Sequence, residues 1–446
     1  MKFPDGFVWG AASASYQIEG APNQDGKGPS IWDIFCRNPG TIKNNDTGDL
    51  ACDSYQQYAR DVEHLSSLGI QAYRFSISWP RILPEGTGMV NQDGLAYYDR
   101  LIDLLLQKGI TPYVTLYHWD LPQRLQKQGG WLSRRTAHAF GEFAGIIAQH
   151  FNHRVKHYIT INEPQCFIGL GYGSGTHAPG LRLPLEEQLT CMHNALLAHG
   201  LACRAIRSHS SDPVQVGVAS TGRLCYPAQD TPPRREAARV ASFILREDDW
   251  SFTHNWFLDA ALLGHYPKNA PGALGQFAAQ VPDTDWSVIC QPLDFLGLNI
   301  YNGHEVDEKG GYLPRFAGFP RTAMKWPVTP QVMHYGCLWL YERYGLPLYI
   351  TENGQSCNDR MFLDGAVHDP DRIDFLHSYL LALERAIQEG APILGYFHWS
   401  LMDNFEWNSG YDERMGLLYA DYRTQRLIPK DSAKWYSRLI QQNGAI

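Results

Sequence analysis

The chain has 446 residues, of which 44% are hydrophobic and 19% are charged, so it is long enough to bury a large core. Its formal net charge of −8 argues against a nucleic-acid partner, which would require a basic face. No run approaches the roughly 18 consecutive apolar residues of a membrane helix, so no membrane partner is expected.

Eight short apolar runs, rich in β-branched and aromatic residues, recur along the chain and predict β-strands. They cover residues 7–10, 72–77, 112–117, 157–161, 214–219, 295–300, 348–350 and 394–397. The runs are almost continuously apolar and do not alternate with polar residues. This pattern is typical of strands that are buried on both faces of a parallel sheet.

Amphipathic helical patterns lie between several of these runs. They are clearest at residues 55–68, 94–107 and 371–389, and each ends beside a glycine. The succession of helix, glycine and strand predicts an α/β fold, a closed (β/α)8 TIM barrel, formed as one domain over residues 1–446. An open doubly wound sheet is disfavoured, because no Gly-x-Gly-x-x-Gly phosphate turn follows the first predicted strand.

Cysteine usage and the start of the chain suggest a compartment. The nine cysteines are odd in number and show no Cys-x-x-Cys spacing, and the chain does not open on a basic segment followed by an apolar stretch. We therefore expect reduced thiols and a cytoplasmic protein.

Two glutamates stand in short polar turns directly after two of the predicted strands. Glu163 belongs to Asn-Glu-Pro after residues 157–161, and Glu352 belongs to Thr-Glu-Asn-Gly after residues 348–350. A carboxylate at the end of a buried strand is costly unless it has a partner or a task. Retaining hydrolysis of a glycosidic bond needs such a pair, one neutral acid and one carboxylate nucleophile.

Other polar residues fall at the carboxyl ends of the predicted strands, the face at which barrel enzymes build their active sites. They are Arg74, His118, Asn162, Asn299, Tyr301 and Trp399. Arg74 could be the cation that keeps one carboxylate ionised, and its alternative role is a structural ion pair. The agreement between independent segments strengthens the prediction of a site at this face.

Three longer motifs join the two glutamates in one pattern: residues 7–20, residues 73–82 and the Asp-Asn-Phe-Glu-Trp of residues 403–407. With them the chain resembles glycoside hydrolase family 1, the β-glucosidase family, over essentially its whole length. The resemblance implies a retaining β-glucosidase of bacterial type in which Glu163 is the acid/base and Glu352 the nucleophile. Its substrates would be terminal β-D-glucosyl residues of cellobiose, a product of cellulose degradation, and of aryl and plant β-glucosides.

The resemblance also implies supporting roles. Catalytic support would come from Arg74, Asn162, Tyr301 and Asn299. The substrate-binding set would be Gln17, His118, Trp119, Asn162, Trp399, Glu406 and Trp407. The aglycone side would be formed by Trp326, Gln165, Leu170 and His177, with Cys166 and Arg223 as further channel residues.

Two positions bear on specificity. Glu406 stands where related 6-phospho-β-glycosidases carry a Ser, Lys and Tyr phosphate grip, and a carboxylate there repels phosphate, so an unphosphorylated glycoside is expected. Gln165 stands where many family members have a bulky apolar residue such as Trp, which leaves the leaving-group preference open.

Several alternatives stay open or are disfavoured. The same site could serve a β-galactosidase, a β-fucosidase or a transglycosylating enzyme, whereas a non-catalytic sugar-binding protein is disfavoured because both glutamates are present. His150, His153 and His157 are spaced for one helical face, but no His-Glu-x-x-His occurs, so no metal and no cofactor are expected. The expected partners are small-molecule β-glycosides and oligosaccharides, and the oligomeric state is left open.

Overall fold

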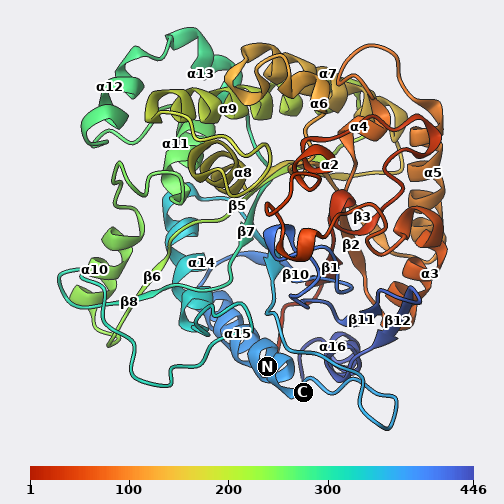
Figure 1. The fold of residues 1–446 in the computed structure, drawn as a ribbon. Helices are drawn as coiled ribbons and strands as arrows, with labels where there is room; N and C mark the ends of the chain where they lie inside the picture. Colours follow the sequence, from red (N-terminus) through yellow and green to blue (C-terminus); the bar gives the residue numbers. More distant parts are fainter. Residues whose placement is uncertain (446) are drawn as a thin grey trace.

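A computed structural model describes residues 1–445, and its centre is a closed barrel of eight parallel strands (Figure 1). The barrel strands are β1 (Val8–Ala12), β2 (Ala72–Ser76), β3 (Thr111–Tyr117), β4 (His157–Asn162), β5 (Gln215–Ser220), β7 (Phe295–Asn299), β9 (Leu348–Asn353) and β10 (Ile393–Trp399). Neighbours pair in chain order around the ring, and β1 closes the barrel by pairing with both β10 and β2. All eight predicted strands and the predicted TIM barrel are confirmed.

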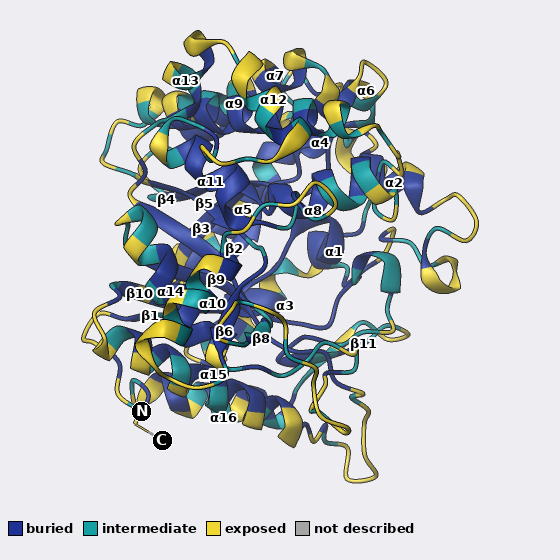
Figure 2. Cartoon of the chain, turned by 90° about the vertical axis from the view of Figure 1, so that its left-hand side faces the viewer, coloured by how far each residue is buried: buried dark blue, intermediate teal, exposed yellow. Residues whose placement is uncertain are grey.

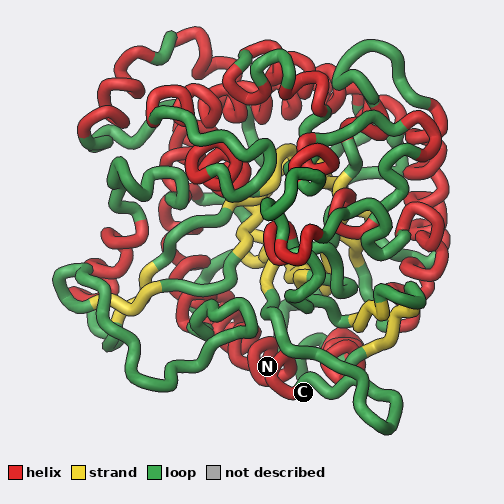
Figure 3. The backbone as a smooth tube through the Cα atoms, viewed as in Figure 1, coloured by secondary structure: helices red, strands yellow, loops and turns green. Residues whose placement is uncertain are grey.

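The longer helices ring the barrel in Figure 3, and residues 1–445 form sixteen α-helices in all. They are α1 (Ser15–Ile18), α2 (Ile31–Phe35), α3 (Ser54–Ser67), α4 (Trp79–Ile82), α5 (Gln92–Gln107), α6 (Gln123–Gln126), α7 (Arg134–His150), α8 (Pro164–Ile168), α9 (Leu185–His209), α10 (Pro232–Ser242), α11 (His254–Leu263), α12 (Gly272–Gln280), α13 (Asp283–Ile289), α14 (Gln331–Tyr344), α15 (Pro370–Gln388) and α16 (Asp431–Gln441). The three helices predicted from amphipathic patterns are α3, α5 and α15. Among residues 1–445, no helix is both long and apolar enough to cross a membrane.

Two small sheets lie outside the barrel. One is the parallel pair β6 (Cys225–Pro227) and β8 (His304–Val306), and the other is the antiparallel pair β11 (Leu418–Asp421) and β12 (Arg426–Pro429). The first pair joins the loop after β5 to the loop after β7, so it fixes backbone at the carboxyl end of the barrel.

The apolar core has two layers, which explains why the strands are apolar on both faces. A smaller cluster takes at least one side chain from each of the eight strands, such as Tyr113, Phe295 and Phe397, and fills the barrel interior. Gly217 makes room there, because a Cβ at this position would overlap the ring of Phe295. A larger cluster packs the outer faces of the strands against the helices, and in Figure 2 the strands are buried while the helices expose their outer sides.

The two ends of the chain lie side by side at the amino end of the barrel (Figure 1). The amide of Phe3 donates to the carbonyl of Asn443 at 3.3 Å, and the indole of Trp9 donates to the Asn443 side chain at 3.0 Å. These bonds tie the last residues of the chain to its first strand.

Candidate active site

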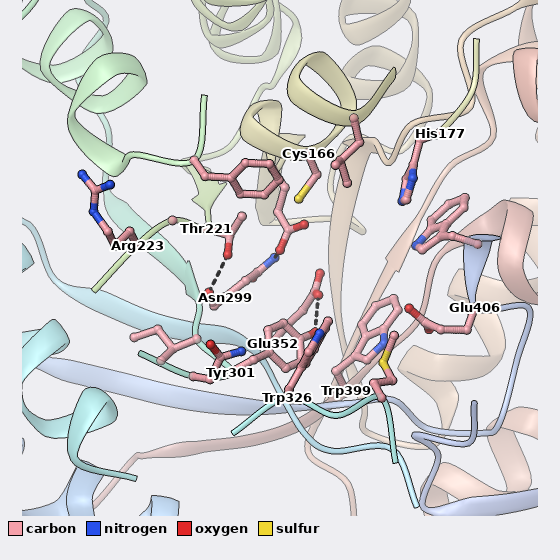
Figure 4. Close-up of a pocket in the computed structure, with 18 of the residues that line it drawn as sticks. Cys166, His177, Thr221, Arg223, Asn299, Tyr301, Trp326, Glu352, Trp399 and Glu406 are labelled. Carbon is pink, nitrogen blue, oxygen red and sulfur yellow. Dashed lines mark hydrogen bonds between the residues drawn. The ribbon is translucent and has the colours of Figure 1, made fainter. Parts of the chain in front are cut away.

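The carboxyl ends of the strands open into a cavity of about 550 Å³ that both glutamates line. Figure 4 shows Glu352 near its middle, with Trp399 and Glu406 toward one end and Arg223 toward the other. The volume lies within the range of about 300–1,000 Å³ that is typical of small-molecule sites. Both glutamates therefore lie at the carboxyl ends of the strands, the face where the sequence predicts the site.

Two donors favour the charged form of Glu352. It is the next-to-last residue of β9 and is only 4% exposed. Nη1 of Arg74 from β2 lies 2.6 Å from its Oε1. The hydroxyl of Tyr301 donates to Oε2 at 2.7 Å. Burial raises the pKa of Glu352, but the charge and hydrogen bonds of Arg74 and Tyr301 oppose that rise.

Glu163 has the opposite electrostatic setting. It follows β4 in the left-handed region at φ 47°, which costs a non-glycine residue about 1–2 kcal/mol and is typical of functional sites. Its Oε1 accepts one hydrogen bond, from Nδ2 of Asn299 at 2.7 Å. Burial, with the nearby charge of Glu352 as the next cause, raises the pKa of Glu163 to about 7.

One hydrogen-bond network connects the two carboxyl groups. Oδ1 of Asn162 accepts from Nη2 of Arg74 at 2.7 Å and from Nδ2 of Asn299 at 3.0 Å, so the Asn162 amide is fixed. Its Nδ2 then faces Nε2 of His118 at 3.2 Å. The hydroxyl of Thr351 donates to Oδ1 of Asn299 at 2.6 Å and orients that amide as well.

Aromatic rings and a third glutamate form one end of the cavity. The rings of His118 and Trp399 lie 5.6 Å apart and nearly parallel, and those of Trp119 and Trp407 lie 4.5 Å apart. Glu406 lines the same end, and burial, with the charge of Glu352 next, raises its pKa to about 8. The resemblance to the family predicts that these residues bind the sugar, and the structure brings them together at one end of the cavity.

Gln17 lies behind this end. Its side chain is completely buried, and Nε2 donates to the carbonyl of Phe405 at 2.9 Å and to Asn404 at 3.1 Å. Within residues 1–445 its Oε1 has no hydrogen-bond partner. A buried acceptor of this kind is unsatisfied until a ligand or water donates to it.

The structure brings three of the four residues expected on the aglycone side into the cavity. Trp326, Leu170 and His177 line the cavity, and the ring of Trp326 meets that of Tyr301 edge-on at 5.3 Å. Gln165 does not lie at the mouth, because its side chain is fully buried and Nε2 donates to Ser220 of β5 at 3.0 Å.

The helical turn of α8 explains the error at Gln165. Positions three apart share one face of a helix, so Cys166, and not Gln165, stands on the side of Glu163. Cys166 lines the cavity accordingly, as does Arg223.

The three histidines considered as a metal site point to separate partners. His150 pairs with Asp99 at 2.9 Å, His153 pairs with Asp212 at 2.9 Å, and His157 stacks on the ring of Tyr113. Over residues 1–445, no cluster of three or more His, Cys, Asp or Glu side chains is arranged to hold a metal ion. All nine cysteines are free thiols.

The structure adds cavity residues that the sequence did not reveal. They are Thr221, Asp249, Phe252, Ile300, Asn302, His304, Tyr312, Met324, Asn408, Ser409 and Met415, together with Gly222 and Leu224. Most come from loops without a recognisable motif, and those after β5 and β7 meet because β6 pairs with β8. No local sequence pattern predicts this contact between the two loops.

A barrel that carries a buried acid and an ion-paired carboxylate at the carboxyl ends of its strands has the architecture of a glycosidase. A family model described as glycosyl hydrolase family 1 matches residues 1–445. Beta-glucosidase A of Thermotoga maritima is 44% identical over 450 residues, covering 99% of this chain and 98% of that protein. The bifunctional beta-D-glucosidase/beta-D-fucosidase of Bifidobacterium breve is 40% identical, covering 100% and 99%.

The fold comparison agrees. The solved structure of beta-glucosidase from Thermotoga maritima in complex with deoxynojirimycin has a TM-score of 0.90 at 44% identity, with both chains covered completely. The chain belongs to glycosyl hydrolase family 1, as the motifs predicted.

Proposed function

We propose that the protein is a retaining β-glucosidase that releases terminal β-D-glucosyl residues from the non-reducing ends of its substrates. The observation that carries the proposal is the asymmetry of the two carboxyl groups. Arg74 and Tyr301 both act on Glu352, whereas Glu163 accepts one neutral hydrogen bond and has a pKa of about 7. Two carboxyls whose environments drive their pKa values apart are suited to nucleophile and acid.

Each step of double displacement has a residue suited to it. Glu163 donates its proton to the glycosidic oxygen while Glu352 attacks the anomeric carbon and forms a glycosyl ester. Formation of the ester removes the negative charge of Glu352, so the pKa of Glu163 falls and it can take a proton from water. Asn162, fixed by Arg74 and Asn299, is placed to bond the sugar 2-hydroxyl, an interaction that strengthens in the transition state.

The sugar-gripping end suits an unphosphorylated pyranose. Trp399 and Trp407 present aromatic faces, and Glu406 offers acceptors for a pair of hydroxyls. Hydroxyl donors would also satisfy the buried Oε1 of Gln17, and Nδ1 of His118 has no partner among residues 1–445. A phosphate would bring further negative charge to an end of the cavity where burial and Glu352 already disfavour the charged form of Glu406.

The wider setting follows from the same proposal. Strands between residues 8 and 399 close one barrel, which supports residues 1–446 as a single catalytic domain. The nine unpaired thiols support a cytoplasmic location, where cellobiose from cellulose degradation and plant β-glucosides would be the substrates. No metal or cofactor is part of the proposed chemistry.

The anomer of the first product tests the mechanism. We expect NMR of a running reaction to show β-glucose before mutarotation, and Glu352→Ala to reduce turnover of an aryl glucoside by at least about 10⁴-fold. Added azide should restore that variant and yield the α-glucosyl azide. Release of α-glucose first would contradict the proposal, and Glu63→Ala, an exposed glutamate on α3, is the matched control that should keep full activity.

A wider glycoside range is the second candidate, because one relative is named as both a beta-D-glucosidase and a beta-D-fucosidase. Initial rates on p-nitrophenyl β-glucoside, β-galactoside, β-fucoside and β-glucoside 6-phosphate rank the sugars. We expect turnover of the unphosphorylated glycosides and none of the phosphate. Product ratios with added alcohols measure transglycosylation, and absence of turnover on every substrate would revive a sugar-binding role.

A further inference from the structure

The cavity continues past the catalytic pair, away from the sugar-gripping end. Its far part is lined by Arg223, Asp249, Phe252, His304 and Tyr312, which we call the outer arm. In Figure 4, Arg223 lies across the cavity from Glu406 with Glu352 between them. A glycoside whose glucosyl unit sits against Glu406 would therefore extend its leaving group toward the outer arm.

The backbone of the outer arm is fixed by hydrogen bonds between loops. Cys225 of β6 pairs with His304 of β8, and the His304 amide donates to the carbonyl of Leu224 at 2.9 Å. The amide of Arg223 donates to the carbonyl of Phe252 at 2.8 Å, and that of Leu313 donates to Glu305 at 2.9 Å. A surface held in this way is pre-organised, so little ordering entropy is lost when a ligand binds.

Two features of the outer arm suit a sugar ring. The first is an aromatic platform: Tyr312 is 44% exposed, and its other face stacks on His304 with ring centroids 4.4 Å apart and planes 10° apart. A ring held by stacking on one side and open on the other can receive the apolar face of a pyranose.

The second feature is a positioned carboxylate. Arg223, only 8% exposed, binds one oxygen of Asp249 and the carbonyl of Ile244, so the Asp249 side chain has a fixed direction. Arg223 bonds Oδ2 of Asp249, which leaves Oδ1, within the described residues, available to a ligand. Nε of Arg223 is buried there without a partner. Tyr312 and His304 both lie within electrostatic range of this ion pair.

We propose that the outer arm is a binding site for the second sugar unit of the leaving group. The preferred substrates are then β-linked gluco-oligosaccharides of three or more units, rather than disaccharides or aryl glucosides. The pyranose face lies on Tyr312, and its hydroxyls donate to Asp249. The inference rests on the proposed β-glucosidase function and adds the class of leaving group to it.

An apolar leaving group fits the outer arm poorly. A long alkyl or aryl group could cover Tyr312 and Phe252, but it would also cover the Asp249 carboxylate without bonding it. Desolvating a charged oxygen without a donor costs more than an aromatic contact gains. Hydroxyl groups remove that cost, which is why we favour a sugar.

Chain-length kinetics test the proposal. We expect cellotriose to have a kcat/KM about threefold to tenfold above that of cellobiose, the size of one aromatic contact. Tyr312→Ala should bring the ratio close to one and leave p-nitrophenyl β-glucoside unchanged, and Tyr312→Phe should keep the ratio. Phe316→Ala is the matched control, since Phe316 is 67% exposed near Tyr312 in sequence but does not line the cavity.

Binding measurements separate the two proposals. With the inactive Glu352→Gln protein, calorimetry should show tighter binding of cellotriose than of cellobiose, and Tyr312→Ala should remove the difference. Aryl-glucoside turnover without any preference for cellotriose would overturn the proposal for the outer arm and leave the proposed function intact. An equal loss of kcat/KM on all substrates in Tyr312→Ala would do the same. The proposal for the outer arm would also fail if octyl β-glucoside bound more tightly than cellotriose. Cellotriose binding by a protein that hydrolyses nothing would overturn the proposed function alone.

Discussion

At the scale of single residues, the site depends on how two carboxyl groups at the end of one barrel are kept different. Both are buried, so both lose hydration and both pKa values rise. Arg74 distinguishes them, because it contacts Glu352 directly, whereas its hydrogen-bond path to Glu163 runs through Asn162 and Asn299. The direct contact with Arg74 therefore favours the charged form of Glu352 over that of Glu163.

This difference predicts the basic limb of the pH profile. Glu163 must be protonated to act as an acid, so kcat/KM should fall as the pH rises through about 7, the pKa of Glu163. In Glu163→Gln the limb should vanish on a substrate with an activated leaving group. Glu406→Gln is the decisive comparison, because the pKa of Glu406 is also raised, to about 8. A limb lost only in Glu406→Gln would refute the assignment.

The hydrogen bond from Tyr301 to Glu352 should set the position of the acid limb of the pH–activity profile. Removing the tyrosine hydroxyl in Tyr301→Phe leaves Glu352 with one hydrogen-bond donor fewer, so the pKa of Glu352 should rise and the acid limb should move to higher pH. We expect kcat to fall by about 10²-fold, as when one oxyanion donor is removed. Tyr312→Phe, which alters a tyrosine outside the catalytic pair, should shift neither limb in the same titration.

At the scale of elements, the end of β9 shows what sequence patterns could and could not predict. The apolar run predicted a strand over residues 348–350, but β9 continues to Asn353. Residues 351–353 are polar and read locally as a turn. Their partners are on other strands: Thr351 bonds Asn299, and Asn353 bonds the carbonyl of Ile300 at 2.7 Å and the hydroxyl of Tyr396 at 2.8 Å.

The same lesson applies to the sugar and aglycone residues. Residues within the long motifs, such as Glu406 and Trp407, can be placed in the site from the sequence, and both line the cavity. Gln165 was assigned from its position after Glu163 without regard to the helical turn that directs it to Ser220. Tyr312 and Asp249 carry no motif, so only the folded loops bring them to the cavity.

Gly354 tests how tightly the ends of β9 and β10 fit together. A Cβ there would overlap the carbonyl oxygen of Trp399 at the end of β10. We expect Gly354→Ala to lower the free energy of unfolding in urea by about 1–3 kcal/mol and to reduce kcat by displacing Glu352. Gly145→Ala in α7 is the control: its Cβ would meet the edge of the His209 ring at 3.3 Å, and alanine favours the helix. Equal stability of the two variants would contradict the prediction.

At the scale of the whole molecule, a buried ion network joins the C-terminal segment to the barrel. Lys430, fully buried just before α16, lies 2.6 Å from Asp359, in the loop after β9, and 2.6 Å from Asp403, after β10. Arg372 of α15 also binds Asp359 at 2.7 Å, and Arg414 binds Asp403 at 2.7 Å. The loops that follow the nucleophile strand and the Trp399 strand are thus tied to the last helix.

Lys430→Met should therefore destabilise the whole fold. Loss of the cation leaves two buried carboxylates with less compensation, and breaking a buried pair costs about 3–5 kcal/mol. Urea unfolding at pH 7 measures the loss. Lys434→Met in α16 is the matched control, because Lys434 pairs with Asp431 on the surface at 3.0 Å and exposed pairs contribute less than about 1 kcal/mol.

The loss of stability in Lys430→Met should depend on pH in a definite direction. Burial alone would raise the pKa of Asp359, but Lys430 and Arg372 hold it below its ordinary value. A carboxyl whose pKa is depressed in the folded state stabilises the fold above its unfolded pKa of about 3.9, and that stabilisation is lost as the pH falls through the folded value. The gap between wild type and Lys430→Met should thus be widest near neutral pH and shrink in acid. A gap that widens in acid would mean that Lys430 does not act through these carboxylates.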